Sequence, residues 1–235
     1  AGNSGATMAA AVKKMGRLPG ISRPGIASFF PTIKQPVMLM DIGANVDCRE
    51  QHLYQFAVMA ASCSRLLLKF DHPRVGLLSI GEETGKGNAL VKETFPLLKE
   101  CPDINFIGSV EAREIPYGDV DVIVCEAFVG NVILKLYEGV AGALVKKIKS
   151  GMMANLKSKI GGLLVKPALK DTLKDFDTSE HGGAPLLGLK GLVVKTHGSS
   201  TSKEVCNSII QCVTFKEQKI NEKITSVIQK NQENI

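Results

Sequence analysis

The chain repeats one local pattern four times: a short apolar run, a loop with glycine, asparagine or histidine, and a helix-like segment. The apolar runs cover residues 36–41, 75–80, 120–125 and 191–195. Short runs without polar alternation are typical of parallel strands that are buried on both faces. Four such units predict an α/β fold with a mostly parallel sheet and helices on both faces.

In a sheet of this kind, the loops that follow the strands lie on one edge, and ligands bind there. We therefore expect the loops at Asn45, Lys86, Asn131 and His197 to converge. None of these loops has the G-x-G-x-x-G pattern, so the dinucleotide fingerprint is absent.

The second of these loops, residues 81–88, reads G-E-E-T-G-K-G-N. A glycine loop between a strand and a helix suits an anion, because free N–H groups and the helix dipole point at it. A Walker A loop would need one more residue and a hydroxyl where Gly87 stands, so a nucleotide triphosphatase is not favoured. Taken alone, the loop is equally compatible with an anion site and with a tight turn that carries a surface lysine.

Polar residues also follow the other strands. Asp41 and Asn45 come after the first apolar run, and Gly130 and Asn131 come after the third. They are candidate ligands of a substrate. The alternative is that they cap turns and helix starts, as Asx residues often do.

Composition limits the other classes of function. The 235 residues suffice for one α/β domain, and 214–235 form a polar C-terminal helix and tail. Six cysteines include no C-x-x-C pair, so we expect neither a metal site nor a disulfide framework. There is no signal sequence and no apolar stretch that we expect to span a bilayer, which favours the cytoplasm.

The basic charge is concentrated in one segment. Between residues 139 and 170 there are seven lysines and no acidic residue, although the whole chain has a net charge of only +6. The apolar residues in this segment alternate with lysines, as in a helical arm that lies in a lipid interface. We expect a protruding basic amphipathic arm over 139–175, with contacts to anionic lipid from Lys157, Lys159, Leu163, Leu164 and Lys166. The alternative is a solvated arm that serves only in dimerisation.

Five motifs in order closely resemble the PlsX family of phosphate acyltransferases. They are D-I-G-A-N at 41–45, G-E-E with K-G-N at 81–88, F-V-G-N at 128–131, G-G-A-P-L-L-G at 182–188 and H-G-S at 197–199. The similarity extends from residue 1 to about residue 213. The family begins with a further N-terminal segment that this chain lacks, so we expect residues 1–235 to be a single α/β domain without its N-terminal part.

The resemblance implies an isocitrate/isopropylmalate dehydrogenase-like fold, a homodimer and a peripheral membrane enzyme without a cofactor. The implied reaction converts long-chain acyl-acyl-carrier-protein and inorganic phosphate to acyl phosphate for phospholipid synthesis. Two alternatives stay open: a phosphate acetyltransferase-like enzyme that uses acyl-CoA, and a non-enzymatic protein that binds phosphate or acyl chains. Nucleic acid is not an expected partner, because the basic segment lacks aromatic residues for stacking.

Carried onto this sequence, the resemblance assigns Lys86 and Asn131 to catalysis. Lys86 would hold phosphate together with neighbouring N–H groups, and the Asn131 amide would donate to the thioester oxygen. Further contacts to phosphate or substrate are expected from Asp41, Asn45, Gly85, Gly87, Asn88, Gly130 and His197.

Other reactive side chains receive structural roles. Cys125 ends an apolar run, which favours a core thiol over an acyl-enzyme nucleophile. His181 and His197 could exchange protons, but we favour structural or substrate-contact roles for both. The family usually has Asp-Gly where this chain has Glu126 and Ala127, and this difference could alter the turn next to Asn131.

Overall fold

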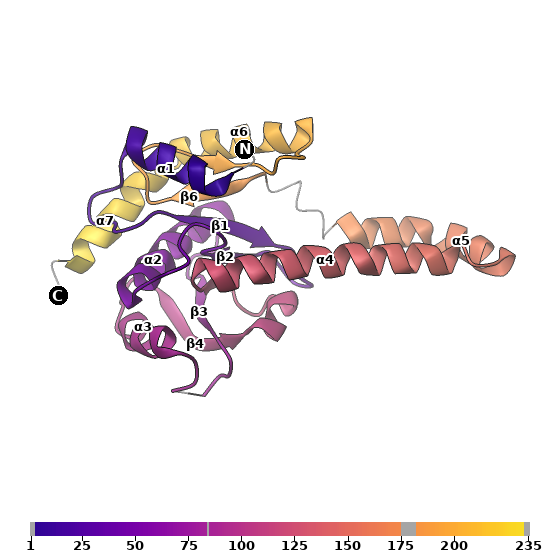
Figure 1. Ribbon diagram of the computed structural model, residues 1–235, viewed down its shortest axis with the longest axis horizontal. Helices are drawn as coiled ribbons and strands as arrows, with labels where there is room; N and C mark the ends of the chain where they lie inside the picture. The colour runs from indigo at the N-terminus through magenta and orange to yellow at the C-terminus, as the bar shows by residue number, and fades with distance from the viewer. Residues whose placement is uncertain (1–2, 84, 175–181, 233–235) are drawn as a thin grey trace.

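A computed structural model describes residues 3–83, 85–174 and 182–232. Seven strands form one sheet in the order β4-β3-β5-β2-β1-β6-β7 (Figure 1). Their bounds are β1 Gly25–Phe30, β2 Val37–Met40, β3 Arg74–Ser79, β4 Asn105–Glu111, β5 Val122–Val124, β6 Ala184–Leu187 and β7 Val194–Lys195.

The two halves of the sheet differ in direction. Strands β4, β3, β5 and β2 are parallel neighbours, whereas β1, β6 and β7 continue the sheet through antiparallel pairs. Because β6 is antiparallel to β1, it runs in the same direction as β2, and β7 runs in the opposite direction. Five of the seven strands therefore point one way, which confirms the mostly parallel sheet.

Helices cover both faces of the sheet, as the sequence predicts. Alternate residues of β2 face two separate cores: Met38 and Met40 lie in one, and Val37 and Leu39 in the other. The first core contains residues of α2, α3 and α7, and the second contains residues of α1 and α4. The helices are α1 Ser4–Met15, α2 Glu50–Leu67, α3 Ala89–Lys99, α4 Ala127–Met152, α5 Leu156–Lys174, α6 Ser202–Glu217 and α7 Ile220–Gln232, with a 3-10 turn at Ala112–Tyr117.

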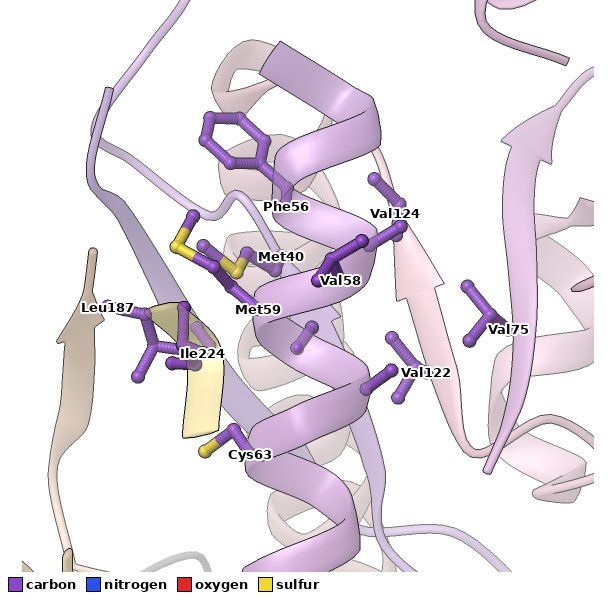
Figure 2. Close-up of a cluster of buried hydrophobic side chains, with 14 of the residues drawn as sticks. Met40, Phe56, Val58, Met59, Cys63, Val75, Val122, Val124, Leu187 and Ile224 are labelled. Atoms are coloured by element: carbon purple, nitrogen blue, oxygen red, sulfur yellow. The ribbon is translucent and has the colours of Figure 1, made fainter. Parts of the chain in front are cut away.

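Helix α2 is the centre of the first core. Phe56 and Met59 are fully buried and lie among side chains from the sheet and from Ile224 of α7 (Figure 2). Gln55 is also buried, and its amide accepts from Ser22 N at 2.8 Å and donates to Gly20 O at 2.8 Å. The helix thereby fixes both the sheet and the loop that precedes β1.

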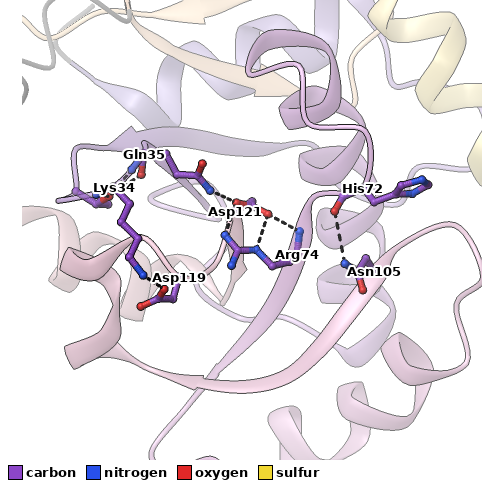
Figure 3. Close-up of polar contacts among 8 residues, drawn as sticks. Lys34, Gln35, His72, Arg74, Asn105, Asp119 and Asp121 are labelled. Carbon is purple, nitrogen blue, oxygen red and sulfur yellow. Dashed lines mark hydrogen bonds and ion pairs between the residues drawn. The ribbon is translucent and has the colours of Figure 1, made fainter.

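A polar cluster closes the edge of the sheet at which β3 and β5 begin. The Asp121 carboxylate accepts from Arg74 Nε and from an Arg74 terminal nitrogen, both at 3.0 Å, and from Gln35 (Figure 3). The bond to Asp121 raises the pKa of Arg74. Lys34 and Asp119 pair beside it. These contacts belong to the edge opposite the strand exits, so they stabilise the sheet without taking part in the site.

Helices α4 and α5 form a hairpin that extends away from the sheet (Figure 1). Of the 26 residues of α4, only Ala127 and Gly130 are buried. Contrary to the sequence expectation, α4 is long and apolar enough to span a membrane, with a mean hydropathy of 1.4 over an 18-residue window. Length and composition alone are weak grounds for a span, because core helices of soluble proteins satisfy the same criterion.

Candidate active site

Three of the strand exits share one edge of the sheet. Strand β5 lies between β3 and β2 and is parallel to both, so the loops after these strands emerge together. The loop after β2 is bonded to the start of α4, where Ala127 N donates to Asn45 O at 2.9 Å. The expected convergence is therefore confirmed for the loops at Asn45, Lys86 and Asn131.

The loop after β3 leaves several N–H groups free at the start of α3. Asn88 caps the helix by accepting from Val91 N at 2.9 Å. Among the described residues, the N–H groups of Gly87, Asn88, Ala89 and Leu90 have no hydrogen-bond partner. Lys86 beside them is exposed and forms no ion pair with any described residue. Free N–H groups next to an unpaired lysine are an arrangement that suits an anion.

Two glycines give this loop its shape. Gly85 and Gly87 have φ values of 93° and 96°, a conformation that side chains oppose. A Cβ on Gly87 would also lie 2.7 Å from Val91 Cγ1 and 3.1 Å from Ser79 Oγ. The loop thus rests directly on the end of β3, where the buried Ser79 hydroxyl has no hydrogen-bond partner in the described part of the chain. Thr84, in the middle of the loop, lies outside the described residues.

The carboxylate of Asp41 is committed to hydrogen bonds with its own turn and with strand β1. Its carboxylate accepts from the N–H groups of Ile26, Gly43, Ala44 and Asn45, at 2.9 to 3.2 Å, and from the Asn45 amide at 2.8 Å. Burial raises the pKa of Asp41, and these hydrogen bonds act to lower it. The side chain is fully buried, so the expected contact of Asp41 with substrate finds no support in this geometry, which favours the capping alternative.

The side chain of Asn45, like that of Asp41, has a structural role. Its side-chain amide donates to Pro24 O and to the Asp41 carboxylate, both at 2.8 Å, and only 5% of the residue is exposed. With both amide hydrogens committed, Asn45 joins three segments at the edge of the sheet. The expectation that it binds substrate finds no support in this geometry.

Gly130 lets α4 approach the end of β2. A Cβ at this position would lie 1.9 Å from Asp41 O and 3.1 Å from Cys125 Sγ. Only glycine fits without moving the backbone of the neighbouring strand. Gly130 therefore supports the site by positioning the next residue, Asn131, at the carboxyl edge.

Glu126 occupies the start of α4. Its carboxylate accepts from Phe128 N at 2.5 Å and from Val129 N at 3.0 Å, and its carbonyl accepts from Gly130 N. These bonds use the N–H groups that would otherwise attract an anion. Sequence reasoning noticed Glu126 only as a departure from the family, although an acidic residue directly before a helix is itself a capping signal.

Asn131 lies in the second turn of α4 rather than at its cap. It is half-buried, and its side-chain amide has no hydrogen-bond partner within the described ranges. This leaves the amide free to donate to a ligand. The alternative role as an N-cap is excluded, because Glu126 holds that position.

The cysteines near this edge are poor nucleophiles. Burial raises the pKa of Cys125 well above its ordinary value, and its thiol donates to Asp41 O at 3.7 Å. Burial also raises the pKa of Cys48 to about 12. The interpretation of Cys125 as a core thiol is therefore supported. Within the described ranges, no group of three or more His, Cys, Asp or Glu side chains could hold a metal ion.

His197 does not join the other three loops, so this part of the expected convergence is wrong. It follows β7, which runs opposite to β2, and Lys195 is aligned with Ala184 at the far end of β6 from Leu187. The sequence could not show this reversal, because it arises from antiparallel pairs between distant segments. His181 lies outside the described residues.

A family described as fatty acid synthesis protein matches residues 1–223. A phosphate acyltransferase of Nitratidesulfovibrio vulgaris is 47% identical over 233 residues, which are 99% of this chain and 68% of the relative. A phosphate acyltransferase of Clostridium acetobutylicum is 48% identical over 225 residues, which are 96% of this chain and 68% of that relative. The chain belongs to the PlsX family. It spans about two thirds of the length of these relatives.

Solved structures of phosphotransacetylases share the fold of this PlsX family member. One from Streptococcus pyogenes has a TM-score of 0.57 at 19% identity, with 90% of this chain and 59% of that chain covered. Another, from Staphylococcus aureus, has a TM-score of 0.53 at 19% identity, with 97% and 61% covered. At this level of identity the similarity concerns the fold alone.

Proposed function

We propose that this chain is a phosphate acyltransferase, which transfers an acyl group from a thioester to inorganic phosphate. The observation that carries the proposal is the start of α3, where four N–H groups lack partners among the described residues and Lys86 is unpaired. A phosphate ion fits this arrangement, and the family's curated members carry the name phosphate acyltransferase.

The chemistry requires positioning more than a strong base. A phosphate oxygen attacks the thioester carbonyl carbon, the new C–O bond forms, and the C–S bond breaks with loss of the thiolate. Phosphate is already anionic near neutral pH, so the site must hold it and stabilise the developing oxyanion. Lys86 and the loop N–H groups would do the first, and the Asn131 amide would do the second.

We propose long-chain acyl-acyl-carrier-protein as the donor, with acyl phosphate for phospholipid synthesis as the product and no cofactor. Trapping the product as its hydroxamate tests this directly, with phosphate omitted as the control. Equal or better turnover of short-chain acyl-CoA would instead favour a phosphate acetyltransferase-like enzyme. Ligand binding without any hydroxamate would favour a binding protein.

Substitution of Lys86 tests the phosphate site. Loss of one charged contact to the anion should lower kcat/KM for phosphate about 100-fold or more in Lys86→Ala. Lys92→Ala, a change at an exposed lysine of α3, is the matched control and should retain activity. Equal activity of the two variants would remove Lys86 from the site.

Asn131→Asp tests the oxyanion donor. The change keeps the shape but places an acceptor where the transition state needs a donor, so kcat should fall about 100- to 1,000-fold. Because Glu126 caps α4, thermal stability should not change through loss of a cap. Normal kcat in a normally stable variant would contradict the assignment.

We further propose that the α4–α5 hairpin is the basic arm, that it contacts anionic membrane, and that the chain forms a homodimer. Leu163 and Leu164 are 71% and 79% exposed, and the lysines around them are exposed as well. Charge reversal at Lys157, Lys159 and Lys166 should abolish binding to anionic vesicles, whereas reversal at Lys92 should not. Sedimentation at several concentrations tests the dimer. Unchanged vesicle binding after the triple reversal would leave the arm as a dimerisation element.

For the architecture we propose the isocitrate/isopropylmalate dehydrogenase-like fold over residues 1–235, with the arm at 139–175 and a C-terminal helical part at 214–235. The mixed seven-stranded sheet with helices on both faces supports this proposal. The bounds of α5 and α7 lie within the two proposed segments. Limited proteolysis, which should release no fragment other than these segments, tests the division.

A further inference from the structure

The loop that carries Lys86 also carries two acidic residues, Glu82 and Glu83. Both are exposed, and neither forms an ion pair with another described residue. Carboxylates next to an anion site oppose binding, because like charges repel each other. The mechanism proposed above does not use either glutamate, so their presence beside the phosphate site has no role in it.

The Glu83 carboxylate folds back over Gly81 and meets Lys86 there. A Cβ on Gly81 would lie 2.8 Å from Glu83 Oε2 and 3.4 Å from Lys86 Cγ, so both side chains lie against the same face of Gly81. Lys86 N also donates to Glu83 O at 3.1 Å, which closes the turn between the two residues. The loop thus brings one acidic and one basic side chain together directly before the free N–H groups of α3.

The Glu83 carboxylate does not hold Lys86 in an ion pair. Its Oε2 lies beside the aliphatic part of the lysine, and no salt bridge joins the two residues in the described ranges. A second polar group in this loop is also uncommitted, since the buried Ser79 Oγ under Gly87 has no hydrogen-bond partner in the described part of the chain. The loop therefore offers acceptors as well as donors to a ligand.

The combination of acceptors and donors suits phosphate better than sulfate. The two ions are tetrahedral and similar in size, and a site made only of N–H and ammonium donors binds both. Phosphate retains at least one P–OH group near neutral pH, whereas sulfate has no proton. An ionised carboxylate can only accept hydrogen bonds, so it bonds to a P–OH group and repels the oxygens of sulfate.

We propose that Glu83 makes the site specific for phosphate over sulfate, by accepting a hydrogen bond from the P–OH group of the bound ion. Lys86 and the N–H groups of residues 87–90 hold the oxygens that carry no proton. The ion keeps its hydrogen, so no proton transfer is involved. This inference rests on the proposed phosphate site and names the residue that determines which oxyanion occupies it.

Glu83→Gln is the first test, and Glu82→Gln is the matched control. Glu82 has the same charge, is also exposed and lies in the same loop, but no hydrogen bond or ion pair joins it to another described residue. The control therefore shows how much the loss of one negative charge strengthens the binding of any anion. The measurement is the inhibition constant of sulfate, divided by the KM for phosphate, in hydroxamate formation.

This ratio should fall about 10- to 100-fold in Glu83→Gln and stay near the wild-type value in Glu82→Gln. The glutamine carbonyl can still accept from a P–OH group, while its NH₂ group donates to a sulfate oxygen instead of repelling it. Equal ratios in the three proteins would overturn the proposal. Should Glu83→Gln lack turnover, the rise in melting temperature caused by each ion gives the same comparison without catalysis.

Arsenate is the second test, because it is protonated as phosphate is. Its oxygen attacks the same carbonyl and releases the same thiol, and thiol release measures its turnover because acyl arsenates hydrolyse in water. The ratio of the KM values for arsenate and phosphate should be the same in wild type and in Glu83→Gln. If arsenate binding changed as sulfate binding does, the P–OH group would not be the feature that Glu83 recognises.

These outcomes separate two kinds of failure. Wild-type protein that forms no hydroxamate from any thioester refutes the proposed acyl transfer itself. Wild-type protein that is active, but that sulfate inhibits at concentrations close to the KM for phosphate, refutes only the role of Glu83.

Discussion

Helices α2 and α4 begin at the same edge of the sheet, after the neighbouring strands β2 and β5, yet their surroundings differ completely. Residues from Leu53 to Ser64 of α2 are almost all buried, between the sheet and α7. In α4 only Ala127 and Gly130 are buried, although Ile133, Leu134 and Tyr137 still pack on the second core, and the later part of the helix extends from the body (Figure 1).

The difference shows how one edge can serve two purposes. Helix α2 gives the edge its rigidity, because its side chains fill the first core (Figure 2). Helix α4 is anchored by its first turn, which positions Asn131, the proposed oxyanion donor, in the next turn, and most of its remaining surface is exposed. The following predictions, in order of expected effect, test this contrast.

The two helices should differ most in how much stability is lost when a large side chain is truncated. Phe56→Ala in α2 removes a fully buried ring and should lower the free energy of unfolding by about 4 kcal/mol. Leu136 of α4 is 63% exposed, so Leu136→Ala should change it by less than about 0.5 kcal/mol. Urea denaturation measures both, and a large loss in Leu136→Ala would show that α4 is covered in solution.

Within α4, the anchored turn should respond differently from the rest. Gly130→Ala forces a methyl group against Asp41 O and should cost about 3 kcal/mol. Gly139→Ala meets nothing within 4 Å and should stabilise the helix by about 0.5 to 1 kcal/mol. Thermal unfolding of the two variants is the measurement. Similar stability would mean that α4 does not dock against β2.

The turn at Asp41 supports both helices, since it leads toward α2 and contacts Gly130 of α4. Each carboxylate oxygen of Asp41 accepts at least two hydrogen bonds. In Asp41→Asn, an NH₂ group replaces one of these oxygens and faces N–H donors, to which it cannot bond. We expect the free energy of unfolding, measured by chemical denaturation, to fall by about 2 kcal/mol. The exposed Asp47→Asn is the control, and equal stability of the two would contradict the buried network.

The smallest effect is expected from thiol chemistry at the starts of the two helices. Burial raises the pKa of Cys48 to about 12, so only a very small fraction of this thiol is ionised at pH 8. Alkylation of Cys48 should therefore be very slow at pH 8 and rise tenfold for each pH unit up to about 12. Cys206, which is exposed, should react first, and mass spectrometry resolves the sites. Rapid labelling of Cys48 would contradict its raised pKa, and rapid labelling of Cys125 in folded protein would reopen the acyl-cysteine alternative.

The sequence predicted three strands of the parallel half of the sheet, because β2, β3 and β5 come from continuous apolar runs, whereas β4 is more polar and gave a weaker signal. The helix expected from about residue 50 is α2, Glu50–Leu67, and the loop with Lys86 leads into α3 as expected. The antiparallel half was missed in part, since β1 follows a Pro/Gly-rich loop and pairs with β6 more than 150 residues later. Such pairing leaves little local signal.

The candidate site was predicted where function depends on local loops and missed where it depends on packing. The strand-loop-helix pattern located Lys86, Asn88 and Asn131 at one edge. It could not show that Asp41 and Asn45 are consumed by hydrogen bonds within the turn, because residue type alone does not distinguish a ligand from a cap. The position of His197 followed from strand direction, which no motif encodes.

Helix α4 is long, and its buried residues lie only in its first turn, so a small rotation there displaces its far end by a large distance. Its 26 residues rise ~39 Å, and the described contacts that hold it to the sheet lie near its beginning. A rotation of ~5° about Gly130 would therefore displace the far end by ~3 Å while Asn131, close to the pivot, hardly moves. A force on the hairpin would therefore change the angle between α4 and the sheet only slightly at Asn131. The hairpin and the candidate site are connected through this one helix.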